Sequence, residues 1–247
     1  AALGAPAAAV FVKIGGWQGS FVAFGVLAAI IWILAWKWYP RTRSSTGDSI
    51  SLVGRYKQVA SKPVLWFLFS TNVAQRMVFT AVLSYLAAYL TEEYGLSTED
   101  TVLPLVLVGI GAIIGAFAGG VVAGRPNRLG TTMFCFLGGG VASAILFSTG
   151  ISEWLVIALA LGVACLFSVG WPILTTRLTE LAESSTATAL GFWATSNQLG
   201  AIGGSAIGGL ALALGGFSMI GIACLVAAIA AASILCLKVP ESPDFTR

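Results

Sequence analysis

The sequence contains no histidine and has few charged residues of either sign. Lys, Arg, Asp and Glu make up 9% of its 247 residues, against about a quarter in soluble domains. The absence of histidine excludes histidine-based catalysis and most zinc sites. The basic residues are dispersed, and a net charge of +3 is no signature of nucleic-acid binding. We therefore expect neither a soluble enzyme nor a nucleic-acid partner.

Cysteine is also scarce, and its placement argues against a metal site. Cys135, Cys165, Cys224 and Cys236 lie singly inside apolar runs and lack the spacing of metal ligands. We interpret them as small packing residues. The sequence also shows no Ser/His/Asp set, no glycine-rich phosphate loop and no membrane-embedded aspartate pair. These absences argue against an intramembrane hydrolase and a nucleotide-driven pump, and no cofactor is expected.

Long apolar runs dominate what is present. Hydrophobic residues make up 57% of the chain, and the mean hydropathy is +0.93. The apolar segments fall at about residues 1–14, 17–39, 64–90, 101–124, 130–150, 153–176, 186–213 and 217–239. The first is too short to cross a bilayer, which takes about 20 residues as a helix. The expected fold is therefore an all-α polytopic membrane protein with seven complete spans and a helix fragment.

The charges between the segments alternate in sign and predict an orientation. One set of connections carries most of the basic residues: Lys37, Arg41, Arg43, Arg55, Lys57, Lys62, Arg125, Arg128, Arg177, Lys238 and Arg247. The opposite set carries acidic residues and no arginine: Glu92, Glu93, Glu99, Asp100 and Glu153. The positive-inside rule then places the linker and the C-terminus in the cytoplasm. We expect an integral protein of a bacterial inner (plasma) membrane.

The segment from Val64 to Leu90 carries a charge, Arg76, at its middle. At about 1.5 Å per residue, a helix of this length crosses a bilayer core of roughly 30 Å with some tilt. An arginine at the centre of such a helix costs roughly 2.5 to 3.5 kcal/mol on insertion scales. Such a side chain normally faces a wet or paired interior, so Arg76 is the strongest functional candidate.

Other polar residues share the helix face of Arg76. Asn72, Arg76, Thr80 and Ser84 recur every four positions, and Gln75 lies beside Arg76. We expect Arg76, Asn72 and Gln75 to contact a substrate, with Arg76 holding an anionic or strongly polar group. Arg76 would otherwise pair with a carboxylate of helices outside this chain. A structural ion pair or a snorkelling side chain remains the alternative.

Segment 186–213 offers a second set of polar side chains. Trp193 and Asn197 lie four residues apart, hence on one helix face, with Ser196 beside them. A Trp–Asn pair can stack on a ligand and hydrogen-bond to it in a mostly apolar pocket. Core packing with a satisfied amide is the alternative. Trp193 and Asn197 complete the predicted substrate-binding set.

An internal repeat indicates how the spans are organised. Residues 1–40 align without a gap to residues 201–240, and Gly15-Gly16 meets Gly215-Gly216 at the turn of each hairpin. The repeat has a period of six spans in parallel orientation, the arrangement of the two halves of major facilitator transporters. On that pattern, four helices would precede this chain.

Three stretches of the sequence resemble the major facilitator superfamily. GWQGSFVAFGVLAAIIWILAWKWYP and the basic linker after it resemble helix 6 and the central cytoplasmic loop of that family. YLAAYLTEEYGLSTEDTVLPLVLVGIGAIIGAFAGGVVAGRPNRLG is similar to helices 7 and 8 and the loop to helix 9. ESSTATALGFWATSNQLGAIGGSAIGGLALALGGF is similar to helix 11. The resemblance runs from the end of helix 5 through helix 12 and is greatest to the drug and sugar efflux branch.

The resemblance divides the chain into four parts. Residues 1–39 would end the N-terminal half, 40–63 would form the cytoplasmic linker, 64–239 the C-terminal six-helix bundle, and 240–247 a cytoplasmic tail. The family is one of transporters rather than enzymes. Its partners would be a small-molecule substrate, the lipid bilayer, protons, and the missing N-terminal helices of the same protein.

The loop between helices 8 and 9 is a weakened copy of a family motif. That motif reads glycine, three residues, aspartate, basic, any residue, glycine, arginine. Gly120, Arg125 and Arg128 match it, whereas Gly124 replaces the aspartate and Asn127 the second glycine. The resemblance implies a cytoplasmic latch or gate formed by these matching residues. Anchoring of the topology by the two arginines is an equally open interpretation.

Two stripes of glycine recur with a spacing of four residues. They are Gly111, Gly115 and Gly119, and Gly200, Gly204 and Gly208. Small residues at this spacing let membrane helices approach closely. In the family, helices 8 and 11 meet helices of the other half, so the resemblance implies sliding interfaces for alternating access. Static packing is the alternative.

The resemblance implies a secondary active transporter that works by alternating access. Proton-coupled efflux of a small organic compound is the first expectation, and uptake or exchange of an organic anion using Arg76 is the second. A truncated, non-transporting membrane fragment or assembly partner is a third, from another class. None of the ten Asp and Glu residues lies inside a predicted span. A carboxylate that carries protons would therefore belong to the missing helices.

Overall fold

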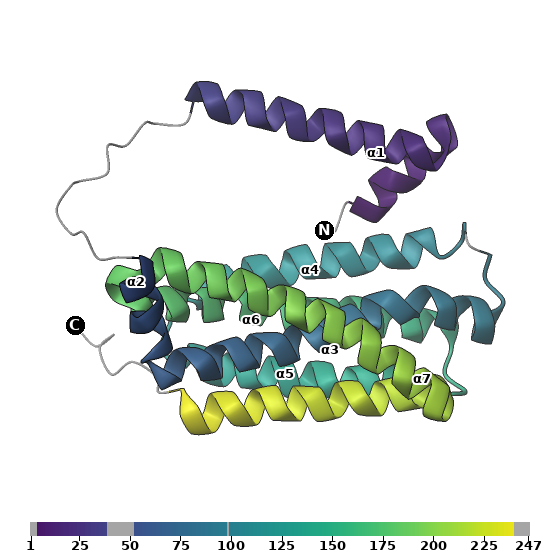
Figure 1. Cartoon of the computed structure of the whole chain (residues 1–247). Coiled ribbons are helices and arrows are strands. Elements are labelled where there is room, and N and C mark those ends of the chain that lie inside the picture. The colour runs from purple at the N-terminus through teal and green to yellow at the C-terminus, as the bar shows by residue number, and fades with distance from the viewer. Residues whose placement is uncertain (1–3, 39–51, 98, 240–247) are drawn as a thin grey trace.

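The computed structural model describes residues 4–38, 52–97 and 99–239, and nearly all of them are helical (Figure 1). The elements in chain order are α1 (Gly4–Trp38), α2 (Leu52–Ala60), α3 (Pro63–Tyr94), α4 (Val102–Val122), α5 (Arg128–Leu146), α6 (Glu153–Ala182), the 3-10 turn η1 (Glu183–Ser185) and α7 (Thr186–Lys238). Six helices of this described part, all except α2, are long and apolar enough to cross a membrane. The predicted all-α polytopic fold is confirmed.

Two of these helices contain a reversal at a glycine. α7 has 53 residues, and its backbone leaves helical geometry at Gly215 and at Gly216, where φ is +70°. In α1 the backbone takes φ +63° at Gly16, the residue that aligns with Gly216 in the repeat. Positive φ is the left-handed region that glycine enters without steric cost. Figure 1 shows both helices folding back, so α7 supplies two spans, and both hairpin turns of the repeat have a glycine with positive φ.

The structure also differs from the sequence-based expectations. The predicted linker contains a helix, α2, which the sequence reading did not anticipate. α6 continues to Ala182, six residues beyond the predicted end of its span. Residues 40–51 of the linker and the tail 240–247 lie outside the described residues.

The helices from α3 onward form one bundle. α3 packs most extensively against α7, α4 against α6, and α5 against both α6 and α7. α1 lies apart from these helices and contacts α4 (Figure 1). None of the residues in its apolar arm, Phe21–Trp38, is buried. The bundle is thus a packed unit, whereas α1 presents an apolar surface.

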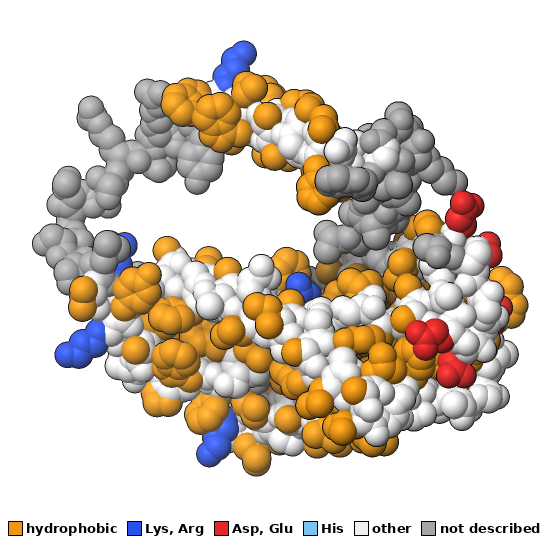
Figure 2. Space-filling model, turned by 45° about the vertical axis from the view of Figure 1, so that its right-hand side comes forward, with side chains coloured by type: hydrophobic (Ala, Val, Ile, Leu, Met, Phe, Trp, Pro, Cys, Tyr) orange, Lys and Arg blue, Asp and Glu red, His pale blue; other side chains and the backbone are white. Residues whose placement is uncertain are grey.

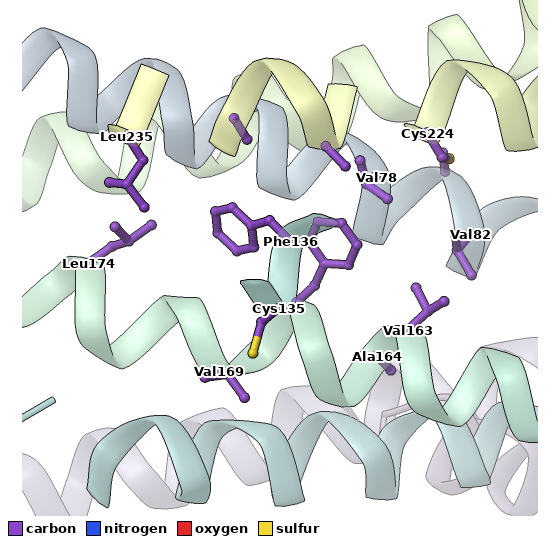
Figure 3. Close-up of a cluster of buried hydrophobic side chains, with 14 of the residues drawn as sticks. Val78, Val82, Cys135, Phe136, Val163, Ala164, Val169, Leu174, Cys224 and Leu235 are labelled. Atoms are coloured by element: carbon purple, nitrogen blue, oxygen red, sulfur yellow. The ribbon is translucent and has the colours of Figure 1, made fainter. Parts of the chain in front are cut away.

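The core of the bundle is built on two aromatic rings that occupy glycine sites. Phe136 of α5 and Phe167 of α6 are stacked, with 5.5 Å between ring centroids. A Cβ added at Gly170 would lie 2.6 Å from the Phe136 ring, and one added at Gly139 would lie 2.6 Å from the Phe167 ring. Each ring therefore fills the space left by a glycine on the opposite helix. Valine, leucine and cysteine side chains from α3, α5, α6 and α7 surround Phe136 (Figure 3).

Charged side chains separate along the bundle. Figure 2 shows the acidic side chains gathered at one end, while most of the visible Lys and Arg side chains lie away from it. The acidic end corresponds to the connection after α3 and the start of α6, where Glu92, Glu93 and Glu153 lie. This distribution agrees with the alternation read from the sequence. The side of the membrane that each end faces stays a prediction.

Candidate functional site

Helix α3 and the first arm of α7 meet along a glycine stripe. A Cβ added at Gly200 would lie 2.5 Å from the Cβ of Arg76. Cβ atoms added at Gly204 and Gly208 would collide with the backbone of Met77 and the ring of Tyr85. The stripe therefore brings the backbone of α7 directly onto the helix that carries Arg76.

The second stripe makes an equally tight contact elsewhere in the bundle. Cβ atoms added at Gly111 or Gly115 would collide with the carbonyl oxygens of Leu161 and Cys165 on α6, and one at Gly119 would meet Val169 in the same way. The sequence suggested that both stripes slide against the other half of a transporter. In this structure each stripe is occupied by a helix of the same bundle, which favours the static-packing alternative, and sliding against the other half stays a prediction.

Polar side chains bridge α3, α6 and α7 beside the first stripe. The Asn72 amide nitrogen donates to the Ser196 hydroxyl at 2.7 Å, and that hydroxyl donates to the Trp193 carbonyl at 2.7 Å. The Gln75 amide nitrogen donates to the Phe167 carbonyl at 2.6 Å. A carbonyl only accepts, and the Ser196 proton is already used. The network therefore fixes the orientation of both amides, with their oxygens left over as acceptors.

The same cluster holds several buried polar atoms that have no hydrogen-bond partner. Within the described residues these atoms are Asn72 Oδ1, Gln75 Oε1, Arg76 Nε, Trp193 Nε1 and Asn197 Oδ1. A buried group left unpaired costs about 1–3 kcal/mol, so native structures keep few of them. These five side chains are the ones that the sequence predicted to bind substrate. The structure brings them together on two adjoining helices.

Arg76 is half-buried near the middle of α3. Its guanidinium carbon lies 5.4 Å from the centroid of the Phe79 ring, a cation–π contact. The described residues give its side chain neither a hydrogen bond nor an ion pair. A guanidinium has five N–H donors in a planar fork that matches a carboxylate or phosphate. Arg76 is thus a positive charge at mid-membrane depth with its hydrogen-bonding capacity unused.

The first arm of α7 supplies the opposite wall of the cluster. Trp193, Ser196, Asn197 and Gly200 are spaced by three and four residues and share the face that meets α3. Trp193 and Ser196 are buried, and Asn197 is half-buried. The unpaired atoms are closed to solvent in this conformation.

A separate apolar pocket lies between α3 and the two arms of α7. It encloses about 420 Å³, and Val78, Gly204 and Cys224 are among its lining residues. No residue of the polar cluster lines it, and its lining suits apolar chains rather than a polar ligand.

The loop motif forms an ion cluster at the basic end of the bundle. Arg128 is buried and binds both carboxylate oxygens of Glu180, at 2.8 and 2.5 Å, as well as the Ala123 carbonyl. Arg177 donates to the same carboxylate at 3.1 Å. Arg125 is exposed. The two matching arginines thus differ, because Arg128 ties α5 to α6 within the bundle and Arg125 does not.

Asn127 explains how the weakened motif keeps its turn. It stands where the family motif has a second glycine, and its φ is +60°. Asparagine is one of the few residues with a side chain that enter the left-handed region routinely. The substitution therefore preserves the backbone conformation that glycine would provide. Gly120 has open space around its Cβ position and takes no part in this turn.

Sequence reasoning missed two partners of the predicted residues. The Phe167 carbonyl that holds Gln75 is a backbone group, for which a sequence carries no signal. Glu180 was placed outside a span because the apolar run ends before it. A signal was present, since Glu180 follows Arg177 by three residues, a spacing that lets helical side chains pair.

Comparison with known proteins agrees with this architecture. A search of curated proteins finds no match to the chain. The family model described as Major Facilitator Superfamily matches residues 1–186, which is three quarters of the 247 residues. With the helical bundle, the repeated hairpin and the membrane-spanning lengths already described, this match identifies the chain as a member of the major facilitator superfamily, a family of transporters.

Proposed function

We propose that the complete protein is a secondary active transporter that moves a small organic compound by alternating access. The observation that carries this proposal is the cluster of five side chains with unpaired buried polar atoms between α3 and α7. Unpaired groups at mid-membrane depth are costly unless a ligand or water satisfies them in another state. Opening of the seam between α3 and α7 would expose them to substrate.

The cluster also defines what each residue would do. Asn72 and Gln75 would accept hydrogen bonds through the amide oxygens that the network leaves free. Arg76 would hold an anionic or strongly polar group, Trp193 would stack on the substrate, and Asn197 would hydrogen-bond to it. Two acceptors with fixed orientation and a cation make a site that selects for polar groups as well as for shape.

Proton-coupled efflux is the direction and coupling that we propose first. It rests on the similarity of the helix 7–8 and helix 11 stretches to the drug and sugar efflux branch. The Asp and Glu residues of the described part lie at helix ends, as Glu92, Glu153 and Glu180 illustrate. We therefore assign the proton-carrying carboxylate to helices outside this chain. The orientation that fits the charge pattern places the linker in the cytoplasm of an inner membrane.

Uptake or exchange of an organic anion is the second candidate, and Arg76 favours it. The guanidinium has no carboxylate partner among the described residues. A carboxylate or phosphate of the substrate would therefore form the ion pair that the guanidinium lacks. A charge-assisted hydrogen bond is roughly twice as strong as a neutral one. An anion would therefore gain more from this site than a neutral compound of the same shape.

The test is transport by the complete protein in proteoliposomes with an imposed pH gradient. We would compare wild type with Arg76→Ala and Arg76→Lys on a panel of anionic and cationic compounds. Lys57→Ala is the matched control, because it removes an exposed cation outside both the cluster and the loop motif. Selective loss of anion transport, partly restored by lysine, would support the anion-binding role.

Other outcomes separate the remaining candidates. Gradient-driven efflux that is unchanged in correctly inserted Arg76→Ala would make Arg76 structural, and efflux would then rest on family membership. Absence of flux for every compound, in protein that is properly inserted, would contradict transport. It would favour the non-transporting reading, in which the chain is a membrane fragment or assembly partner.

A further inference from the structure

A pocket between α2 and the start of α7 has no role in the proposed transport cycle. It encloses about 440 Å³, and its lining includes Arg55 and Tyr56 of α2 with Thr188, Phe192 and Thr195 of α7. It therefore combines one cation, three hydroxyl-bearing residues and an aromatic wall, and no acidic residue lines it. Figure 1 shows α2 beside the first turns of α7, although the two helices are far apart in the sequence.

The position of α2 is fixed by contacts at its C-terminal end. Val59 is fully buried, and the Gln58 side-chain oxygen accepts a hydrogen bond of 2.5 Å from the Ser185 hydroxyl. Lys62 donates to the Leu181 carbonyl at 2.9 Å and pairs with Glu183 at 3.0 Å. The pocket is thus held between two anchored elements rather than formed by a free surface helix.

Aromatic residues place this pocket at the level of a membrane interface. Trp66, in the first turn of α3, is 45% exposed, and its indole nitrogen donates to the Ala60 carbonyl at 3.1 Å. The rings of Trp66 and Tyr56 both contact Phe192, with centroids 5.8 and 5.7 Å away. Tryptophan and tyrosine concentrate where hydrocarbon gives way to lipid headgroups. Tyr56 and Phe192 line the pocket, which thus lies at the end of a membrane-spanning helix.

The charge around the pocket is positive. Arg55 and Lys57 are exposed on α2, and the described residues give neither of them an ion pair. Basic residues next to a membrane-spanning helix are attracted to anionic lipids. Thr188 also lines the pocket, and the Phe192 ring offers an apolar surface for the first methylene groups of a lipid chain. These features fit the phosphodiester of a lipid headgroup, together with the glycerol and the first methylene groups of the acyl chains.

We propose that this pocket binds the headgroup of an anionic phospholipid from the adjacent membrane leaflet, with Arg55 holding the phosphate. A bilayer supplies this ligand at the depth where the pocket opens, and the anchored α2 would then report the lipid composition to α3 and α7. This binding is independent of the substrate site, because none of the pocket residues belongs to the polar cluster.

The experiment counts lipids retained by the complete protein. Protein would be taken from nanodiscs containing phosphatidylethanolamine and phosphatidylglycerol at three to one, and bound phosphatidylglycerol measured by native mass spectrometry. Arg55→Gln removes the proposed phosphate ligand. Lys57→Gln is the matched control, since it removes the same charge from the same helix outside the pocket. Both sites are exposed, and unfolding temperatures would verify that each variant folds.

We expect Arg55→Gln to lower phosphatidylglycerol retention about tenfold, the usual effect of losing one charge-assisted hydrogen bond, and Lys57→Gln to leave it near wild type. Equal losses in the two variants would overturn the proposal, because they would show diffuse attraction by the basic surface. Unchanged retention in Arg55→Gln would overturn it as well. Displacement of the lipid by millimolar inorganic phosphate would assign the pocket to a free anion instead.

Discussion

Asn72 on α3 and Ser196 on α7 are joined by a buried hydrogen bond of 2.7 Å between amide nitrogen and hydroxyl oxygen. This bond lies one helical turn from Gly200, where an added Cβ would collide with α3. It also fixes the Asn72 amide so that its oxygen has no partner among the described residues. The contact between α3 and α7 is therefore tightly packed and, at the same point, leaves a buried amide oxygen without a hydrogen bond. Contacts that are purely structural rarely leave such a group unpaired.

The first prediction concerns this bond. Ser196→Ala leaves the Asn72 amide nitrogen buried without an acceptor, so we expect a loss of about 1–3 kcal/mol in stability. Asn72→Leu combined with Ser196→Ala removes both partners and should be close to wild type in stability. Thermal unfolding of the complete protein in detergent measures both effects. Transport by the stable double variant should fall if Asn72 contacts substrate.

The outcome that would contradict this prediction is specific. A double variant as unstable as Ser196→Ala would mean that shape, not hydrogen bonding, decides stability at this seam. A stable double variant with full transport would remove Asn72 from the proposed substrate site.

A second prediction concerns the glycine stripe of α4. Gly115→Ala places a Cβ against the carbonyl oxygen of Cys165, so we expect α4 and α6 to separate at a cost of about 1–3 kcal/mol or more. Gly120→Ala on the same helix meets open space and should be neutral or stabilise by about 0.5–1 kcal/mol. Unfolding temperatures of the two variants give the comparison. Similar temperatures would show that the stripe does not form the contact described.

The third prediction concerns the ion cluster at the basic end. Glu180→Gln leaves the buried Arg128 without its carboxylate. Breaking a fully buried pair costs about 3–5 kcal/mol. Because the Glu180 side chain is 30% exposed, we expect a smaller loss, about 2 kcal/mol. Glu183→Gln is the control, since that side chain is 73% exposed and surface pairs contribute about 0–1 kcal/mol.

Salt provides an independent check on the same cluster. Raising the ionic strength should weaken the exposed pair of Glu183 and change the Arg128–Glu180 pair little, because buried pairs are poorly screened. A Glu180→Gln variant that unfolds at the wild-type temperature would show that the Arg128–Glu180 pair does not stabilise the bundle. That result would favour the interpretation of the loop as a latch.

The fourth prediction concerns the backbone at Asn127. Asn127→Gly keeps the positive φ and should be neutral or stabilising, because glycine enters that region without strain. Asn127→Val forces a β-branched residue into it and should cost about 1–2 kcal/mol. Unfolding temperatures decide the order glycine, asparagine, valine. Equal stability of the valine and glycine variants would mean that the turn is not left-handed in the protein.

Hydrophobicity along the chain determined the spans without reference to tertiary structure. A bilayer requires helices of about 20 apolar residues with internally satisfied backbones, so the run lengths predict the elements directly. The repeat predicted the turns at Gly16 and Gly216 for a similarly local reason, because glycine adopts a positive φ without steric cost. Arg76 stood out because a charge near the middle of an apolar helix is costly, whereas one near its end reaches the interface.

Tertiary structure alone decided which helix meets which. The glycine stripes predict a close approach but do not specify a partner, and the structure assigns Gly115 to α6 and Gly204 to α3 of the same bundle. The carbonyl that orients Gln75 and the carboxylate that binds Arg128 come from residues 92 and 52 positions away. Helix periodicity describes one helix at a time. Pairings between helices depend on how whole surfaces fit together, and that information appears only once the bundle is assembled.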